Sequence, residues 1–304
     1  MDQPLKRRAR YRDTPQLGDR IFELLELPFP GVTAGRRNGE AFGIPWEEAS
    51  TPFVAWHGDR VVCHVGLLQM PLHVMGRDRL VGGVHGVATH PDFRRRGLFR
   101  AVLTELFEFA ADRFDTLVLT TLHPEYFRPF GFRVIPEFVH RAVPVEPARV
   151  PDARALDLTV AADHALLHGL IERRGPVSRY LGVGAEKACF GFVEFRSLIR
   201  ASASLDLAVV CERVGSTLRI YDIVATRIPT LAQLLGLAGE AAAIDEVVCF
   251  FAPDRVAGRF AAESHDMTGG PSALEPGTAG WVLMARGPFA ADGHPVMLPR
   301  PARC

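Results

Sequence analysis

The segment Arg94–Gly97, with the sequence Arg-Arg-Arg-Gly, has the residue types of an anion-binding loop. It follows an apolar run that ends at Thr89. From Leu98 onward, apolar side chains recur with the spacing of one helical face, at positions 98, 99, 102, 103, 106, 107 and 110. Glycine lets the backbone approach a ligand without a Cβ, and the exposed N–H groups of the first helical turn attract an anion. Three arginines beside those amides favour a phosphate, in particular a pyrophosphate.

A simpler interpretation of this segment is a solvated turn between a core strand and a core helix, which any short motif leaves open. The neighbouring residues show where the segment lies. Val84–Thr89 suits a strand, and Pro91 prevents its continuation as a paired central strand. The basic loop therefore lies between a strand and a helix.

This order of residues resembles the acetyl-CoA pyrophosphate loop of the GNAT N-acetyltransferase superfamily, whose pattern is Gln/Arg-x-x-Gly-x-Gly/Ala. Arg94, Gly97 and Phe99 occupy its named positions. The bulky Phe99 departs from that pattern. A bulky residue at this position resembles the acetyltransferases of the enhanced-intracellular-survival type. The resemblance implies acetyl-CoA as a co-substrate and a binding set of Val87, Ala88, Thr89, Arg94, Arg95, Arg96, Gly97, Leu98, Phe99 and Arg100.

A second motif, at residues 126–132, resembles the family's Tyr-x-x-x-Gly-Phe segment, in which the tyrosine protonates the departing CoA thiolate. Counting back four residues from Gly131 leads to Phe127. Tyr126 is therefore displaced by one residue, which is about 100° around a helix. Three alternatives follow: Tyr126 reaches the sulfur because the helix is locally rearranged, no tyrosine performs the step, or both aromatic residues belong to the core.

Acyl transfer from a thioester to an amine requires a deprotonated amine, a stabilised oxyanion and release of the thiolate. The resemblance implies two splayed parallel strands, here 80–89 and 116–122. Free backbone N–H groups at Val87, Ala88 and Thr89 would contact the carbonyl and the pantetheine. Alternation along the first strand places His85 on the same face as positions 83, 87 and 89.

His85 is thus the titratable group best placed to remove a proton from an amine at neutral pH. His64, on the neighbouring strand, and His123, after the strand 116–122, are the next candidates. Each also fits a histidine that is satisfied by hydrogen bonds in a half-buried sheet, and the sequence favours that interpretation for His64 and His123.

Gly31–Ser50 mixes glycine, proline, aromatic and charged residues and is predicted to be a loop with at most one helical turn. In the GNAT superfamily this region borders the acceptor site. There, Trp46 with Glu40, Glu47 and Glu48 would attract and stack on a cationic amine. A solvated acidic loop is the simpler interpretation.

The other patterns of the first half predict the alternation of strands and helices that is typical of a GNAT fold. Proline, glycine and charged turns bound the apolar runs. The expected elements are a short strand at 8–12, a helix at 17–27, a hairpin of 53–56 and 61–70, strands at 80–89 and 116–122, a short helix at 125–131 and a return strand at 132–145.

The second half resembles the first faintly, after a linker at 143–157 that is rich in proline and arginine. A hairpin pattern at 207–222 is followed by a Val-Ala-Thr segment at 224–226, as at 87–89, and by a helical stretch at 231–237. Ile228-Pro229-Thr230 stands where a glycine loop would be needed. We therefore expect a catalytic GNAT domain with the acetyl-CoA site at 1–145. A degenerate GNAT-like domain at 146–304, without a CoA loop, should pack on it and wall part of the acceptor cleft. We expect no counterpart of the third, sterol-carrier-like domain of the survival-type enzymes.

Composition narrows the classes of function. The 304 residues suffice for two domains, with 48% hydrophobic and 23% charged residues. A formal net charge of zero gives no general attraction to nucleic acid or to an anionic membrane, and it disfavours an aminoacyl-tRNA-dependent transferase. Five widely spaced cysteines without a Cys-x-x-Cys pair indicate neither a zinc site nor a disulfide framework. Without an apolar signal region or a membrane-length apolar run, a cytoplasmic protein is expected.

The sequence thus predicts an α/β protein with α+β mixed sheets and a GNAT fold. Its predicted function is that of a bacterial N-acetyltransferase without a metal, which moves an acetyl group from acetyl-CoA to a primary amine of a small molecule or peptide by direct attack in a ternary complex. Tyr126 and His85 are its predicted catalytic residues. The alternative is a GNAT-fold protein that has lost catalysis and binds CoA as a regulatory or scaffold module. The displaced tyrosine favours that alternative, whereas the Arg94–Gly97 loop and His85 favour the enzyme.

Overall fold

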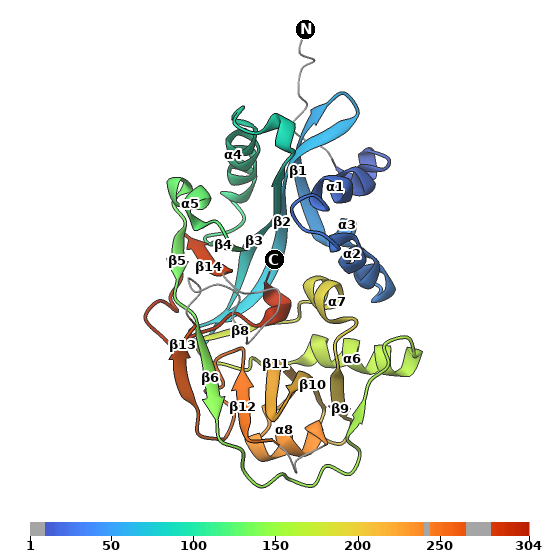
Figure 1. The fold of residues 1–304 in the computed structure, drawn as a ribbon, viewed down its shortest axis with the longest axis vertical. Helices are drawn as coiled ribbons and strands as arrows, with labels where there is room; N and C mark the ends of the chain where they lie inside the picture. Colours follow the sequence, from blue (N-terminus) through green and yellow to red (C-terminus); the bar gives the residue numbers. More distant parts are fainter. Residues whose placement is uncertain (1–9, 240–243, 266–280, 304) are drawn as a thin grey trace.

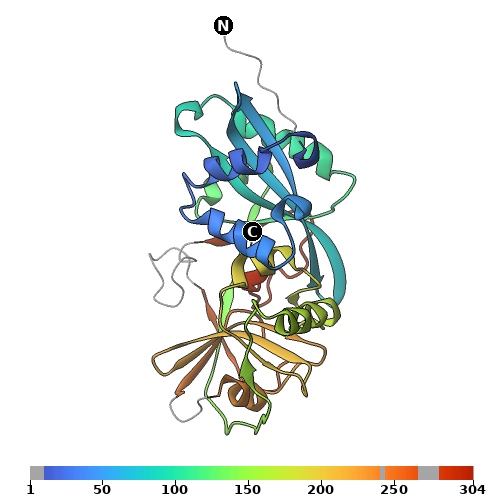
Figure 2. The same cartoon turned by 90° about the vertical axis from the view of Figure 1, so that its right-hand side faces the viewer.

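A computed structural model of the protein describes residues 10–239, 244–265 and 281–303. These residues form two seven-stranded mixed sheets, one in each half of an elongated molecule (Figures 1 and 2). Helices cover the sheets and fill the space between the halves. The predicted fold class, α/β with mixed sheets, is confirmed.

The first sheet has the strand order β1-β2-β3-β4-β14-β5, and a short strand, β8, pairs with β2. Neighbouring strands are antiparallel except for β3 and β4, which are parallel and are connected through helix α4. The strand bounds are β1 Ser50–His57, β2 Arg60–Val74, β3 Arg77–Thr89, β4 Leu117–Thr121, β5 Arg133–Ile135, β8 Leu181–Val183 and β14 Val282–Arg286.

Helices cover both faces of this sheet, as Figure 1 shows. Helix α4 packs one face, where its buried Val102, Leu103 and Leu106 join a core with side chains of β1, β2 and β3. Helix α1 packs the other face. The helices of this half are α1 Leu17–Leu25, α2 Val32–Ala41, α3 Trp46–Ala49, α4 Leu98–Ala110 and α5 Pro124–Phe127, with single 3₁₀ turns η1 Tyr11–Asp13, η2 Pro91–Phe93 and η3 Arg128–Phe130.

The second sheet has the strand order β13-β6-β12-β11-β10-β9-β7. Its parallel pair, β11 and β12, is connected through α8, as β3 and β4 are through α4. The bounds are β6 Phe138–Ala142, β7 Arg154–Ala155, α6 Ala161–Arg173, α7 Ala188–Glu194, β9 Ile199–Ser202, β10 Leu207–Val214, β11 Thr217–Ala225, α8 Leu231–Ala238, β12 Glu246–Cys249, β13 Ala261–Ser264 and η5 Arg300–Ala302.

The two halves exchange one strand each. Strand β6, which follows β5 of the first sheet, crosses into the second sheet and lies between β12 and β13. Strand β14, from the C-terminal part of the chain, returns to the first sheet and lies between β4 and β5. The sheets therefore do not separate at residue 145, where the sequence suggested a domain boundary.

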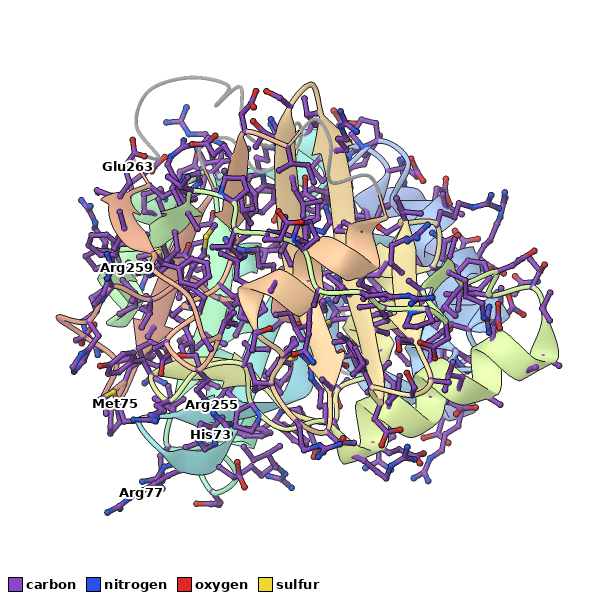
Figure 3. The ribbon with its side chains drawn as sticks, turned by 90° about the horizontal axis from the view of Figure 1, so that it is seen from below. His73, Met75, Arg77, Arg255, Arg259 and Glu263 are labelled. Atoms are coloured by element: carbon purple, nitrogen blue, oxygen red, sulfur yellow. The ribbon has the colours of Figure 1, made fainter. Side chains whose placement is uncertain are left out.

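The β2–β3 hairpin also bridges the halves. At its tip the N–H groups of Met75 and Gly76 donate to the carbonyl oxygens of Tyr180 and Arg179, at 3.0 and 2.8 Å. Figure 3 shows this tip, marked by Met75 and Arg77, at the edge of the second half.

The segment 31–50 differs from its prediction, because it contains the ten-residue helix α2 and the short helix α3 instead of a loop. Gly31 begins α2 with a φ of 87°, and Gly35 and Gly39 are buried within it. A Cβ at Gly35 would lie 2.3 Å from the ring of Phe192 in α7, so this glycine allows close helix contact. Tertiary packing here overrides the low helix propensity of glycine.

Two further elements differ. The expected strand at 8–12 lies partly outside the described residues, and the described part is the 3₁₀ turn Tyr11–Asp13. The return strand expected at 132–145 is divided into β5 and β6, because Pro136 interrupts it and the chain then leaves one sheet for the other.

In the described part of the chain, no helix is long and apolar enough to cross a membrane, and no cluster of three or more potential metal ligands occurs. Cys63, Cys189, Cys211 and Cys249 are free thiols in buried positions. Burial raises the pKa of the Cys63 and Cys211 thiols to about 11, which fits small core residues. Cys304 lies outside the described residues.

Candidate active site

Strands β3 and β4 separate soon after they meet. They pair only at Gly82–Leu117 and Gly83–Val118, although β3 continues to Thr89. A β-bulge lies in the separated part, where three residue steps of β3 oppose two of β2 and Gly86 has a φ of 56°. Beyond Gly83, the β4-facing backbone edge of β3 therefore has no strand partner among the described residues.

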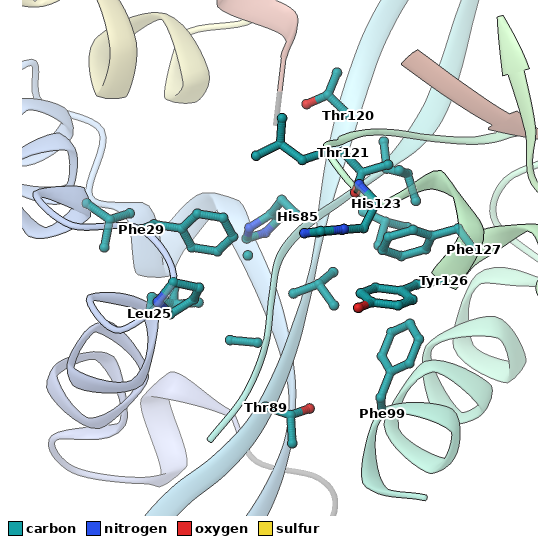
Figure 4. A pocket seen from close by; sticks show the side chains of 18 of the residues that line it. Leu25, Phe29, His85, Thr89, Phe99, Thr120, Thr121, His123, Tyr126 and Phe127 are labelled. Carbon is teal, nitrogen blue, oxygen red and sulfur yellow. Dashed lines mark hydrogen bonds between the residues drawn. The ribbon is translucent and has the colours of Figure 1, made fainter. Parts of the chain in front are cut away.

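A cavity of about 1250 Å³ opens at this separation. One side consists of the ends of β3 and β4, the start of α4, and the α5–η3 segment. The other side consists of residues from α1, α2, α3, α7 and η5, so both halves of the chain wall it. Figure 4 shows His123 and Tyr126 on one side and Leu25 and Phe29 on the other, with His85 between them.

The basic loop presents unpaired amides to this cavity. Gly97, with a φ of 77°, precedes α4, and no side chain in the described part of the chain caps the helix. The N–H groups of Leu98, Phe99 and Arg100 lack intrahelical acceptors because they start the helix. With the positive end of the helix dipole, they form a site suited to a phosphate.

All the predicted cofactor-binding residues except Arg96 line the cavity. The Arg96 guanidinium donates to the carbonyl oxygen of Asp92 at 2.9 Å and lies 5.0 Å from the Phe93 ring centroid. The Arg94 side chain donates from Nε to the carbonyl oxygen of Thr89 at 3.3 Å and remains exposed. Arg100 lies over the Phe130 ring.

Both aromatic residues of the second motif line the cavity, but they differ in exposure. Tyr126 is 57% exposed, lines the cavity, and stacks on His123 with ring centroids 5.0 Å apart. Phe127 is 4% exposed and packs edge-on against Phe99 and Phe132. The hydroxyl-bearing residue is thus the more exposed of the two, despite its one-residue offset. The bulky Phe99 completes this aromatic cluster by packing edge-on against Phe127 and Phe130.

His85 lies in the cavity wall at the centre of β3. Its Nε2 is 2.9 Å from Ser50 Oγ. Its ring packs against Trp46 in a T-shaped arrangement, with ring centroids 5.0 Å apart. A Cβ at Gly66 would come within 2.2 Å of the imidazole, so this glycine makes room for it. Burial, together with the neighbouring His64, lowers the pKa of His85 well below its usual value, and the ring is therefore neutral at pH 7.

The other two histidines have different surroundings. His64 is fully buried and outside the cavity lining; its Nδ1 is 2.6 Å from the carbonyl oxygen of Gly86, and burial lowers its pKa to about 4. His123 lines the cavity but is exposed, with Nδ1 3.1 Å from Glu125 Oε1. His85 is thus the buried histidine of the cavity wall.

The acidic residues near Trp46 do not assemble a cation site. Glu47 pairs with Arg36, Glu40 and Glu48 are exposed, and none of the three lines the cavity. Trp46 itself is buried in the cavity wall. The alternative in which these glutamates hold a cationic amine is therefore wrong.

Comparison with known proteins agrees with this geometry. Residues 16–135, which contain the loop, the splayed strands and Tyr126, match the family model of the acetyltransferase (GNAT) domain. This segment is a GNAT acetyltransferase domain. No curated protein sequence matches the chain significantly.

Solved structures share the fold over both halves. A probable N-acyltransferase from Enterococcus faecalis superposes with a TM-score of 0.62 at 12% identity, over 95% of this chain and 73% of that one. Eis1 from Mycobacterium abscessus gives 0.55 at 15% identity, over 81% of this chain and 64% of Eis1. A putative acetyltransferase from Pyrococcus horikoshii gives 0.53 at 12% identity, over 100% and 97%. At these identities the similarity shows the fold alone.

Several residues of the GNAT cavity carried no signal in the sequence. Ser50 bonds to His85 across 35 residues, and Phe192 of α7 reaches Trp46 with ring centroids 4.5 Å apart. Arg300 and Arg303 enter the wall from the C-terminal end of the described chain. These residues reach the cavity through tertiary contacts, and no short sequence motif predicts their position there.

The corresponding region of the second half is closed. The side-chain oxygen of Thr230 accepts from the N–H of Gln233 in a capping box, so amides at the start of α8 are already satisfied. Asp222, which corresponds to His85 when residues 224–226 are matched to 87–89, forms a fully buried ion pair with Arg174. The nearby pocket at Arg227 measures only about 260 Å³.

The protein should therefore bind one CoA per chain. Only α4, and not α8, combines a glycine in the left-handed region with uncapped amides that face a large cavity. Calorimetric titration with CoA measures the stoichiometry directly. Two bound CoA molecules per chain would contradict this prediction.

Proposed function

We propose that this protein is an N-acetyltransferase that transfers the acetyl group of acetyl-CoA to a primary amine of a small molecule or peptide. The amine attacks the thioester directly while both substrates are bound. We assign the CoA site to the GNAT domain and regard residues 146–304 as a degenerate GNAT-like part. Its strands β12 and β13 pair with β6, and its residues complete the cavity. We also expect the protein to work in the cytoplasm.

The observation that carries this proposal is the meeting of the uncapped α4 terminus and the splayed β3–β4 edge in one cavity. The loop amides suit a pyrophosphate, and Arg94 and Arg100 add charge. From there, a pantetheine arm would extend along Val87–Thr89. Their free backbone groups suit hydrogen bonds to an amide chain and to a carbonyl oxygen on which negative charge develops.

His85 is the proposed acceptor of the amine proton. Because the pKa of His85 is well below its usual value of 6.5, the imidazole is neutral at pH 6.5 and above. In this form it can accept a proton. The same burial disfavours the imidazolium, so the proton must pass on, and Ser50 Oγ at 2.9 Å offers a route. Tyr126, on the side of the cavity that also holds His123, is the proposed donor to the thiolate.

The alternative is a GNAT-fold protein that binds CoA as a regulatory or scaffold module, which the offset of Tyr126 favours. Parallel measurement of CoA binding and of amine-dependent thiol release separates the two. The enzyme gives both signals, and mass spectrometry finds the acetylated amine. A module gives saturable CoA binding without thiol release, and that result would refute the proposed function.

A further inference from the structure

The part of the cavity that faces α1, α3 and α7 is an aromatic wall. Phe22, Phe192 and Trp46 follow one another with ring centroids 6.5 and 4.5 Å apart, and the Trp46 edge then meets His85 at 5.0 Å. Phe29 lies beside this wall. A molecule held near His85 therefore contacts aromatic and aliphatic side chains.

In the described part of the chain, the same wall offers no carboxylate to a ligand. Among the described residues that line the cavity, Glu125 is the only acidic one, and it lies on the opposite side beside His123. The other charged residues of the lining are the arginines Arg94, Arg95, Arg100, Arg300 and Arg303. The described lining thus carries more positive than negative charge.

Two acidic residues that directly follow cavity-lining residues in the chain are held by other groups of the protein. Glu26 accepts from the N–H groups of Gly31 and Thr33, both at 2.8 Å. Glu194 in α7 is buried and accepts from Arg300 at 2.7 and 2.6 Å. Both carboxylates are thus compensated within the protein, and neither is available to a cationic substrate.

These charges select among amines. A monoamine becomes neutral when it loses the proton that must leave before attack, and its body can then lie on the aromatic wall. A polyamine or an aminoglycoside keeps further ammonium groups that would be desolvated without a counter-charge, which is strongly unfavourable. The same argument disfavours a lysine-rich peptide.

We propose that the acceptor is a primary monoamine with an aromatic or bulky aliphatic body, of the arylalkylamine class, and that polycationic amines are excluded. This inference rests on the proposed acetyltransferase function. Phe29 and Val193 are then specificity-determining residues, because both line the cavity and reach it from partly exposed positions.

Two pairs of variants test the wall. Phe29→Ala should raise the KM for 2-phenylethylamine about tenfold, with the KM for acetyl-CoA unchanged, because an aromatic contact is lost. Leu27→Ala is the matched control, since Leu27 is 51% exposed and outside the lining.

Val193→Glu should raise kcat/KM for spermidine about tenfold by supplying a counter-charge. Leu198→Glu, also at an exposed apolar position outside the lining, should not.

The deciding experiment compares 2-phenylethylamine and tryptamine with spermidine and kanamycin as acceptors for the wild-type protein, with acetyl-CoA and with octanoyl-CoA as donors. We expect kcat/KM to be at least tenfold higher for the arylalkylamines with acetyl-CoA. Higher activity with spermidine or kanamycin would leave the enzyme standing and overturn this inference. A preference for octanoyl-CoA with equal rates for all amines would also overturn it, because an acyl chain would then fill the wall. CoA binding without acetylation of any amine would instead refute the proposed function.

Discussion

Replacing Tyr126 by phenylalanine should lower turnover by about 10²–10⁴-fold, the usual contribution of a placed acid or base. The phenol lies on the cavity side that also holds His123, where it is proposed to protonate the CoA thiolate as it departs. CoA affinity should remain nearly unchanged, because the hydroxyl is not part of the phosphate loop. Steady-state rates together with calorimetric titration of CoA measure both quantities.

Tyr180→Phe is a matched control for that substitution. Tyr180 also stacks on a histidine, His294, with ring centroids 4.6 Å apart, but it does not line the cavity. Its hydroxyl should be dispensable for turnover. Phe127→Tyr restores the family spacing, yet it should not rescue Tyr126→Phe, because position 127 is buried against Phe99 and Phe132. A wild-type rate in Tyr126→Phe would mean that solvent or another group protonates the thiolate.

Gly97→Val should abolish CoA binding. Gly97 has a φ of 77°, a conformation that costs a residue with a Cβ about 1–2 kcal/mol. Beyond its two chain neighbours, no atom of the described residues lies within 4 Å of the position that a Cβ would take, so the space around Gly97 is open. It would stand where the backbone must approach a pyrophosphate, so the loss falls on binding.

Gly76→Val separates backbone strain from ligand exclusion. Gly76, at the turn between β2 and β3, has a φ of 76° and equally open space around its Cβ position, but it lies outside the cavity lining. Both variants should lose similar stability in thermal unfolding, and only Gly97→Val should lose CoA binding in calorimetry. Wild-type affinity in Gly97→Val would show that the phosphates bind elsewhere.

Local patterns predicted the parts of the site that local forces build. Helix α4 begins at Leu98 as expected, because apolar periodicity and a glycine in the left-handed region act within a few residues. The hairpins and the strands β3 and β4 followed from alternation and from turn residues in the same way. These elements carry the splayed edge and the loop proposed to bind phosphate, so much of the proposed CoA side of the site was predictable.

Non-local packing decided the rest. Helix α2 forms because α7 packs closely on Gly35, a contact between residues far apart in the chain. The exchange of β6 and β14 pairs residues more than 100 positions apart, which no periodicity encodes. The aromatic wall likewise joins Trp46 to Phe192. On the proposed acceptor side, the sequence therefore pointed to Trp46 but not to the residues that pack against it.

The offset of Tyr126 depends both on the local sequence pattern and on non-local packing. Residue counting alone leads to Phe127, and about 100° around a helix separates the two side chains. The structure buries Phe127 in an aromatic cluster at the cavity wall and leaves Tyr126 exposed, because α5 is a single turn that continues directly into η3. Which aromatic residue is buried depends on Phe99 and Phe132, and these contacts lie beyond the motif.

The most direct measurement of the central claim is thiol release from acetyl-CoA across a panel of primary amines, with mass spectrometry of both protein and products. Direct attack in a ternary complex predicts that CoA is released only when an amine is present. One acetylated amine should then form for each CoA, and no acetylated protein should accumulate with acetyl-CoA alone. CoA that binds at one site per chain without amine-dependent release from any member of the panel would contradict the account.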